Sequence, residues 1–154
     1  MTMEDIGPAP VAFDIEQQTL GNDNYRTVIW SGKFMQVTVM SIPVGEDIGL
    51  EVHPDTDQFL RIEQGKGMAK MGDSKDNLDF VKTVEDDDVI IVPAGKWHNV
   101  ENVGDEELKL YSIYAPAHHK PGKIHKTKAD DNEIDDEPAE WSFQPPRTGE
   151  DQHA

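Results

Sequence analysis

Apolar and polar residues alternate through the middle of the chain, and this alternation predicts β-strands. Val37–Ile42 alternates between two faces, and Leu108–Tyr114 does the same. Successive side chains of a strand point to opposite sides, so this period indicates sheets with one buried face. Turn-forming residues separate such runs at a spacing of roughly ten residues, with few helical patterns between them. The pattern favours an all-β sandwich or barrel.

Short β-rich runs of this kind follow one another along the chain. The predicted strands are Arg26–Trp30, Phe34–Ile42, Leu50–His53, Gln58–Gln64, Gly67–Met71, Leu78–Val84, Val89–Val92, His98–Asn102 and Leu108–Tyr114. Because these strands follow one another closely, they predict one barrel domain at residues 25–115.

The two ends of the chain differ from this barrel region. Residues 1–24 show no clean period and are expected to form an N-terminal arm, in which Val11–Leu20 is either a short strand or a helical turn. Residues 116–154 are polar and carry an acidic cluster. We expect a polar, partly disordered tail there, which Trp141 and Phe143 could pin to the barrel or to a neighbouring chain.

Charge restricts the expected partners. The 154 residues carry 14 Lys and Arg against 31 Asp and Glu, a formal net charge of −17. This charge disfavours nucleic acid and anionic membrane surfaces, because both would repel the protein. The chain has no cysteine, which excludes thiolate metal sites and disulfides. No apolar run approaches the roughly 20 residues of a membrane span, and the start lacks a secretory pattern, so we expect a cytoplasmic protein.

The candidate metal ligands lie in two separate segments. Glu51 and His53 are two residues apart in a predicted strand, so a carboxylate and an imidazole project from one face. After a turn at Pro54, the next strand begins at Gln58, whose amide oxygen can return to the same place. In the second segment, a Pro-Ala-Gly turn stops an apolar strand and His98 enters the next one. Two oxygens and two nitrogens suit Mn, Fe, Co, Ni or Zn.

The spacing of these segments resembles the two motifs of the cupin family. The first motif falls on Gly45, Glu51, His53, Gln58 and Gly65. The second falls on Pro93, Gly95, His98 and Asn102, with Asp87 where a glycine is usual. The resemblance spans about residues 34–115. It implies a double-stranded β-helix, or jelly-roll barrel, that pairs into a homodimer.

The resemblance also implies a retained but altered metal site. The family's usual ligands are three histidines and one glutamate, whereas Glu51 here replaces the first histidine and Gln58 replaces the glutamate. The set keeps one negative charge and an oxygen donor at each replaced position. Neutral Gln58 is a weak ligand that either binds loosely or only orients a water. The alternative is a metal-free barrel whose polar residues hydrogen-bond one another.

A histidine-bearing stretch follows the last predicted barrel strand and could fold across the mouth of the barrel. It contains His118, His119 and His125 within the only locally basic part of the chain. We predict that His119 and His125 move protons in catalysis, and that the basic residues could receive a carboxylate or phosphate. The alternative for this stretch is a solvated loop.

Three further residues, Arg61, Tyr111 and Lys96, are candidates for substrate binding. Arg61 follows Gln58 in its strand and would hold an anionic substrate if it faced inward; an outward salt bridge is the alternative. Tyr111 and Tyr114 point to opposite faces, so only one of them reaches the lumen. Lys96 lies beside His98.

Function follows less directly than fold, because one fold supports many reactions. Small cupins include sugar-phosphate isomerases, dioxygenases, decarboxylases and non-catalytic binders. We expect a metal-dependent enzyme on a small oxygen-rich substrate, with an isomerase of the mannose-6-phosphate isomerase-like subgroup slightly favoured. A non-haem Fe dioxygenase and a non-catalytic cupin that binds a small ligand are the alternatives.

Overall fold

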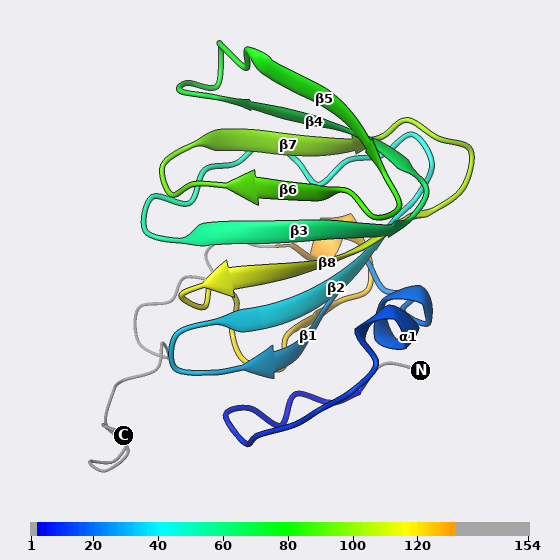
Figure 1. Cartoon of the computed structure of the whole chain (residues 1–154), viewed down its shortest axis with the longest axis vertical. Coiled ribbons are helices and arrows are strands. Elements are labelled where there is room, and N and C mark those ends of the chain that lie inside the picture. The colour runs from blue at the N-terminus through cyan, green and yellow to red at the C-terminus, as the bar shows by residue number, and fades with distance from the viewer. Residues whose placement is uncertain (1–2, 132–154) are drawn as a thin grey trace.

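The computed structural model describes residues 3–131, which form two antiparallel β-sheets (Figure 1). The elements in chain order are α1 (Ile15–Leu20), β1 (Arg26–Ser31), β2 (Gln36–Ile42), β3 (Asp57–Gln64), β4 (Lys66–Gly72), β5 (Phe80–Glu85), β6 (Val89–Val92), β7 (Trp97–Asn102), β8 (Leu108–Ala115), β9 (Ile124–His125) and the 3-10 turn η1 (Lys128–Asp130). The expected all-β class is confirmed.

The larger sheet has the strand order β6-β3-β8-β2-β1-β9, and the smaller sheet has the order β5-β4-β7. The main apolar cluster takes side chains from both sheets, including Leu60 and Ile62 of β3, Met71 of β4 and Val100 of β7. Complete burial of such a side chain stabilises the fold by roughly 1.5–3 kcal/mol. The inner faces of the two sheets therefore form one core, as expected for a jelly-roll barrel.

One predicted strand, Leu50–His53, does not form. Only Glu51 pairs there, in an isolated antiparallel bridge with His98. Gly49 turns the chain just before this pair with a φ of +90°, and Pro54 follows shortly after without an N–H to donate. The loop between β2 and β3 therefore contributes only isolated bridges to the smaller sheet, this one and the bridge of Asp47 with Glu101 of β7.

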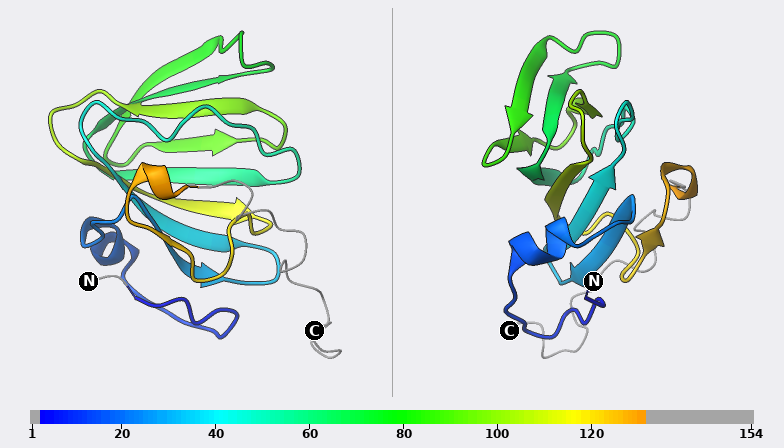
Figure 2. Two further views of the ribbon diagram at one scale, coloured as in Figure 1. Left: turned by 180° about the vertical axis from the view of Figure 1, so that it is seen from behind. Right: turned by 90° about the vertical axis from the view of Figure 1, so that its right-hand side faces the viewer.

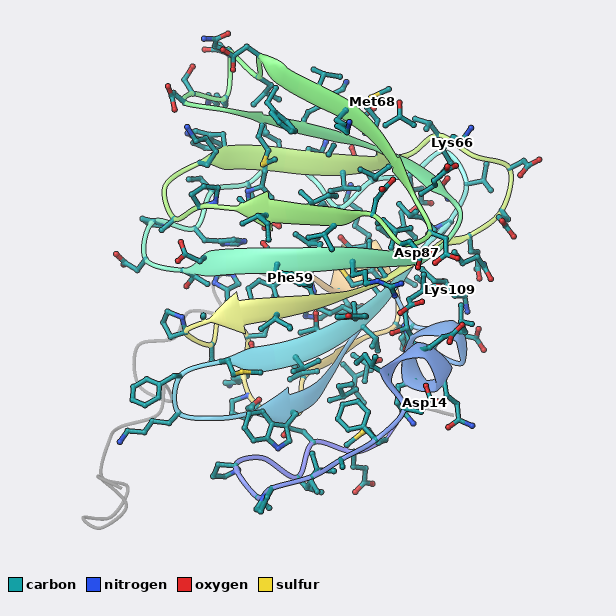
Figure 3. All side chains as sticks on the ribbon, in the orientation of Figure 1. Asp14, Phe59, Lys66, Met68, Asp87 and Lys109 are labelled. Carbon is teal, nitrogen blue, oxygen red and sulfur yellow. The ribbon has the colours of Figure 1, made fainter. Side chains whose placement is uncertain are left out.

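The N-terminal arm contains the helix α1, which settles the choice between strand and helical turn. The carboxylate of Asp14 caps this helix by accepting a hydrogen bond from the Gln17 backbone N–H at 3.0 Å. Lys109 of β8 is buried beside α1 and donates to the carbonyls of Leu20 and Asn22 at 2.9 and 2.8 Å (Figure 3). The arm is thus attached to the barrel. Among residues 3–131, no helix has the length and apolar character needed to cross a membrane.

The first part of the expected tail packs on the barrel and extends its larger sheet. In β9, Ile124 and His125 pair with Thr27 and Arg26 of β1. The chain then reaches η1, on the side of the larger sheet that faces away from the viewer in Figure 1 (Figure 2, left). Residues 132–154, with Trp141 and Phe143, lie outside the described residues.

Asp87 adopts the backbone conformation for which the family motif usually carries glycine. Its φ is +78°, in the left-handed region that non-glycine residues enter at a cost. Asp is among the residues that tolerate this region best. The Asp87 backbone N–H donates to the Ile62 carbonyl at 3.1 Å, and its carboxylate pairs with Arg61. The turn before β6 is therefore kept despite the substitution.

Candidate metal centre

Three side chains that could hold a metal ion converge inside the barrel. The Nε2 atom of His53 lies 3.7 Å from Oε2 of Glu51, and Nε2 of His98 lies 4.0 Å from the same oxygen. One ligand atom from each residue lies within 4.8 Å of the others. His53 is 5% exposed and His98 is 1% exposed, so the two imidazoles are shielded from solvent.

Backbone hydrogen bonds hold the two ligand-bearing segments together. Glu51 and His98 exchange N–H···O bonds of 3.0 and 2.9 Å, and the Gly95 N–H donates to the His53 carbonyl at 2.9 Å. Gly95 has a φ of +86°, a conformation that glycine adopts without strain. Nδ1 of His98 lies 3.1 Å from the Lys96 carbonyl. Because a carbonyl only accepts, Nδ1 carries the proton and Nε2 is left with a lone pair for a metal.

The donor atoms of this cluster fit a cation. Nε2 of His53, Nε2 of His98 and Oε1 of Gln58 are buried and have no hydrogen-bond partner among residues 3–131. A buried unpaired polar atom costs about 1–3 kcal/mol, and native proteins rarely leave several together. The Gln58 amide donates to Oγ of Ser112 at 2.8 Å, which orients its oxygen as a remaining acceptor. A divalent first-row ion would satisfy such nitrogen and oxygen donors.

The surroundings of Glu51 and His98 favour the protonation states in which these residues can bind a metal ion. Burial alone would raise the pKa of Glu51, but contact with His53 and the positive charge of Arg26 hold it below the ordinary value. Burial lowers the pKa of His98. The carboxylate is therefore ionised and the His98 imidazole neutral near pH 7, as metal binding requires.

Further ring side chains line the lumen next to the candidate ligands. The His118 ring lies 4.1 Å from the His53 ring and stacks on Tyr114 at 5.6 Å. Nε2 of His119 lies 3.3 Å from the Tyr114 hydroxyl. Burial and the neighbouring His53 lower the pKa of His118 to about 4, and burial raises the pKa of Tyr114 to about 12. These groups are therefore neutral at pH 7.

A buried cation, Arg26, also belongs to this interior. Its side chain is 1% exposed, and its pairing with Met40 across β1 and β2 places it on the lumen face. One guanidinium nitrogen, Nη1, lies 3.1 Å from Oδ2 of Asp131 and 3.2 Å from Nδ1 of His125. His125, one of the two predicted proton carriers, thus contacts Arg26, whereas His119 contacts Tyr114.

Arg61, expected to bind substrate, lies on the opposite face of β3 from the lumen. It pairs with Glu63 and Asp87. Gln58 and Leu60 of the same strand are buried on the inner side, so the odd-numbered Arg61 is directed outward by strand alternation. The alternative of an outward salt bridge is the arrangement found.

Tyr111 and Lys96 are also not brought to the lumen. Tyr111 packs on the outer apolar cluster that contains Val39, because Tyr114 takes the inward register in β8. Lys96 is directed to the surface, where its ammonium group pairs with Asp73. Neither side chain is therefore placed beside the candidate metal ligands, and the structure does not support their expected role in substrate binding.

Sequence reasoning missed Arg26 and did not assign His118 a role of its own. Arg26 is the first residue of β1, and a charged residue at a strand end is normally a surface residue, so the sequence carried no signal of its burial. His118 was visible only as a member of the histidine-bearing stretch. Tyr114 was left open against Tyr111, and the register of β8 decides between them.

Comparisons with known proteins agree with the fold. A family model described as "Cupin domain" matches residues 38–114. The uncharacterized protein YrkC of Bacillus subtilis (strain 168) is 57% identical over 130 residues, which are 84% of this chain and 70% of that protein. An uncharacterized protein of Acanthamoeba polyphaga mimivirus is 41% identical over 112 residues, 72% of this chain and 68% of that protein.

A solved structure extends the agreement to three dimensions. The crystal structure of BH2720 from Bacillus halodurans is similar with a TM-score of 0.82 at 54% identity, covering 83% of this chain and 97% of that one. The segment matched by the family model contains the three converging side chains Glu51, His53 and His98. The sequence match, the jelly-roll sheets and this similarity lead to one conclusion: the chain belongs to the cupin family.

Proposed function

We propose that this cupin is a metal-dependent enzyme that acts on a small oxygen-rich substrate. Glu51, His53 and His98 are the proposed metal ligands, and Gln58 is a weaker fourth donor. The observation that carries the proposal is the pair of buried imidazole nitrogens, His53 Nε2 and His98 Nε2, which face one carboxylate and have no partner among the described residues. The donor set suits Zn, Mn, Fe, Co or Ni.

The bound metal would supply Lewis acidity that polarises a carbonyl or hydroxyl of the substrate. Glu51, as a ligand, is then not a free base, so proton transfer falls to other lumen residues. Neutral His118 can accept a proton, and His119 can exchange one with the Tyr114 hydroxyl at 3.3 Å. His125 contacts Arg26 and acts through it as a positioning residue.

An isomerase of the mannose-6-phosphate isomerase-like kind is the favoured reaction. Moving a proton between neighbouring carbons needs a base, and a Lewis acid that polarises the carbonyl makes the proton easier to remove. The ligand cluster and the neutral imidazole of His118 would supply these two functions. A second candidate is a non-haem Fe dioxygenase, which one observation favours. The converging cluster consists of two histidines and one carboxylate, the donor composition of many non-haem Fe(II) oxygenases.

Metal analysis and turnover test this proposal. Purified protein should carry first-row metal at up to one ion per chain by elemental analysis, and His98→Ala should lose it. Lys96→Ala is the matched control, because its exposed side chain pairs with Asp73 and only its backbone contacts His98. Equal metal content in wild type and His98→Ala would overturn the site.

The reaction class follows from assays on the metal-loaded protein. Interconversion of mannose 6-phosphate and fructose 6-phosphate would support the isomerase, and oxygen consumption with Fe(II) would support the dioxygenase. A copurified ligand with no turnover in either assay would instead favour the non-catalytic binder.

We also propose a cytoplasmic homodimer without nucleic-acid or membrane partners. The formal net charge of −17 supports the absence of nucleic-acid and membrane partners, because both are anionic. For the dimer, the outer face of β3 and β6 carries Phe59 opposite Ile91, and Ile91 is 54% exposed. Light scattering should give a dimer mass, which Ile91→Glu should halve. A monomeric wild type would contradict the dimer.

A further inference from the structure

A charged group inside the barrel, Arg26, is not among the proposed metal ligands. Arg26 is 1% exposed, on the lumen face of β1. Removing a guanidinium from water is strongly unfavourable unless anions and hydrogen bonds compensate it. Its attraction for the ionised carboxylate of Glu51 contributes to the lowered pKa of that residue. Arg26 therefore lies near enough to the ligand cluster to influence it.

The hydrogen-bonding capacity of Arg26 is only partly used. Both close contacts, with Asp131 at 3.1 Å and with His125 at 3.2 Å, involve the single nitrogen Nη1. Because arginine only donates, Nδ1 of His125 must accept. The buried Nε has no hydrogen-bond partner among residues 3–131. A guanidinium normally binds a carboxylate or phosphate through two parallel N–H groups, so this one retains an unused donor.

The anion that contacts Arg26 comes from a surface segment. Asp131 directly follows η1, and its side chain is 20% exposed. The segment is held to the loop between β2 and β3 by the ion pair of Lys128 with Asp47. Figure 2 (left) shows η1, in orange, on the same side of the larger sheet as this loop. The Arg26–Asp131 pair therefore connects the interior with the surface.

A depression of about 200 Å³ lies at this point. It is lined by Ile48, Gly49, Leu50, Glu51, Lys128 and Asp131. Its wall thus includes both a proposed metal ligand and the carboxylate that contacts Arg26. A small molecule that enters here would therefore meet both carboxylates.

From this geometry we infer that Arg26 is the binding subsite for an anionic group of the substrate, and that Asp131 occupies this subsite until the substrate displaces it. The ligand is a small molecule with a carboxylate or phosphate group, and a second oxygen of the same molecule reaches the metal beside Glu51. The inference deepens the proposed function, on which the metal contact rests. The contact of Arg26 with the anion does not depend on the metal.

Displacement of Asp131 exchanges one anion on Arg26 for another, so the total charge around the guanidinium is preserved. The internal carboxylate nevertheless competes with the ligand. Apparent affinity is reduced by the fraction of molecules whose site is open, so a site that is closed about nine-tenths of the time binds about tenfold more weakly. Removing the competing charge should recover that factor.

Calorimetric titration of the metal-loaded protein tests the inference with three probes: glycolate, inorganic phosphate and neutral ethylene glycol. Asp131→Asn should bind glycolate or phosphate about tenfold more tightly than wild type, with ethylene glycol unchanged. Asp76→Asn is the control, because it removes the same charge from the exposed hairpin between β4 and β5. Arg26→Gln should abolish anion binding and retain metal. The anion that gains affinity tells a carboxylate ligand from a phosphate ligand.

Equal anion affinities in Asp131→Asn, Asp76→Asn and wild type would overturn the subsite, as would full anion binding by a folded Arg26→Gln. If Arg26→Gln fails to fold, the Asp131→Asn comparison decides alone. Repeating the phosphate titration on metal-free protein separates the two proposals. If Asp131→Asn gains tenfold in anion affinity but the protein binds no metal, the metal centre is refuted and the subsite is kept. If the protein binds metal but Asp131→Asn gains no anion affinity, only the subsite is refuted.

Discussion

Glu51 and His98 bond to each other through both of their backbone groups, with N–H···O distances of 3.0 and 2.9 Å. Through this one bridge the carboxylate of Glu51 comes within 4.0 Å of the imidazole Nε2 of His98. The two residues belong to segments that are far apart in the chain. Because their proximity is imposed by backbone bonds, the candidate metal centre is formed by the fold and does not require the ion for its assembly.

Metal removal should therefore leave the protein folded but less stable. A ligand that binds only the native state stabilises it by about 2.7 kcal/mol at 100 times its dissociation constant. Treatment with EDTA should lower the midpoint of thermal unfolding and leave the far-ultraviolet circular dichroism spectrum of the β-sheet unchanged at 25 °C. Loss of that spectrum on chelation would show that the ion builds the site.

Gln58 should contribute less to metal affinity than the histidines. Its amide oxygen is neutral, and its orientation depends on the hydrogen bond to Ser112. We expect Gln58→Leu to weaken metal binding about tenfold, at the low end of the range for supporting residues, and His53→Ala to abolish binding. Competition with a chromogenic chelator measures both. Equal losses in the two variants would make Gln58 a full ligand, and no loss in Gln58→Leu would remove it from the site.

Stability of the metal-free protein should fall as pH drops below about 6.5. Burial, followed by the charge of Arg26, holds the pKa of His119 well below its ordinary value. The native state keeps this imidazole neutral, whereas the unfolded chain takes up a proton below its own pKa. The stabilising contribution is therefore complete above the unfolded pKa and is lost as pH falls toward the native pKa.

Between pH 7.5 and 5.5, this linkage should reduce the free energy of unfolding by about 1 kcal/mol for His119 alone. Urea denaturation at the two pH values measures the decline. His119→Gln should show a decline smaller by about that amount, whatever its absolute stability. A variant with the same pH dependence as wild type would exclude His119 as its source.

The turn at Asp87 offers a test of backbone strain. With a φ of +78°, this position favours glycine, the residue that the family motif usually carries. Asp87→Ala should lower the free energy of unfolding by about 1 kcal/mol, since alanine lacks the polar side chain that makes the left-handed region tolerable. Asp87→Gly loses the same contact with Arg61 and is the matched control. Equal destabilisation would assign the effect to the lost ion pair.

The sequence by itself determined the fold class and brought the right segments to attention. Alternation and turn spacing predicted an all-β barrel, and the motif spacing singled out Glu51, His53 and His98, which the fold brings together. This worked because strand period and turn residues are local properties. The exception is Leu50–His53, where neighbouring Gly49 and Pro54 leave a single bridge in place of a strand.

Only the tertiary structure decided which side chains enter the lumen. A slip of one residue in register turns every side chain of a strand to the other face, so the sequence could not tell which of Tyr111 and Tyr114 faces the lumen. Arg26 was overlooked because its burial depends on β9 and Asp131, about a hundred residues further along the chain. Contacts between distant segments leave no local period in the sequence, and the charge inside this barrel is set by such contacts.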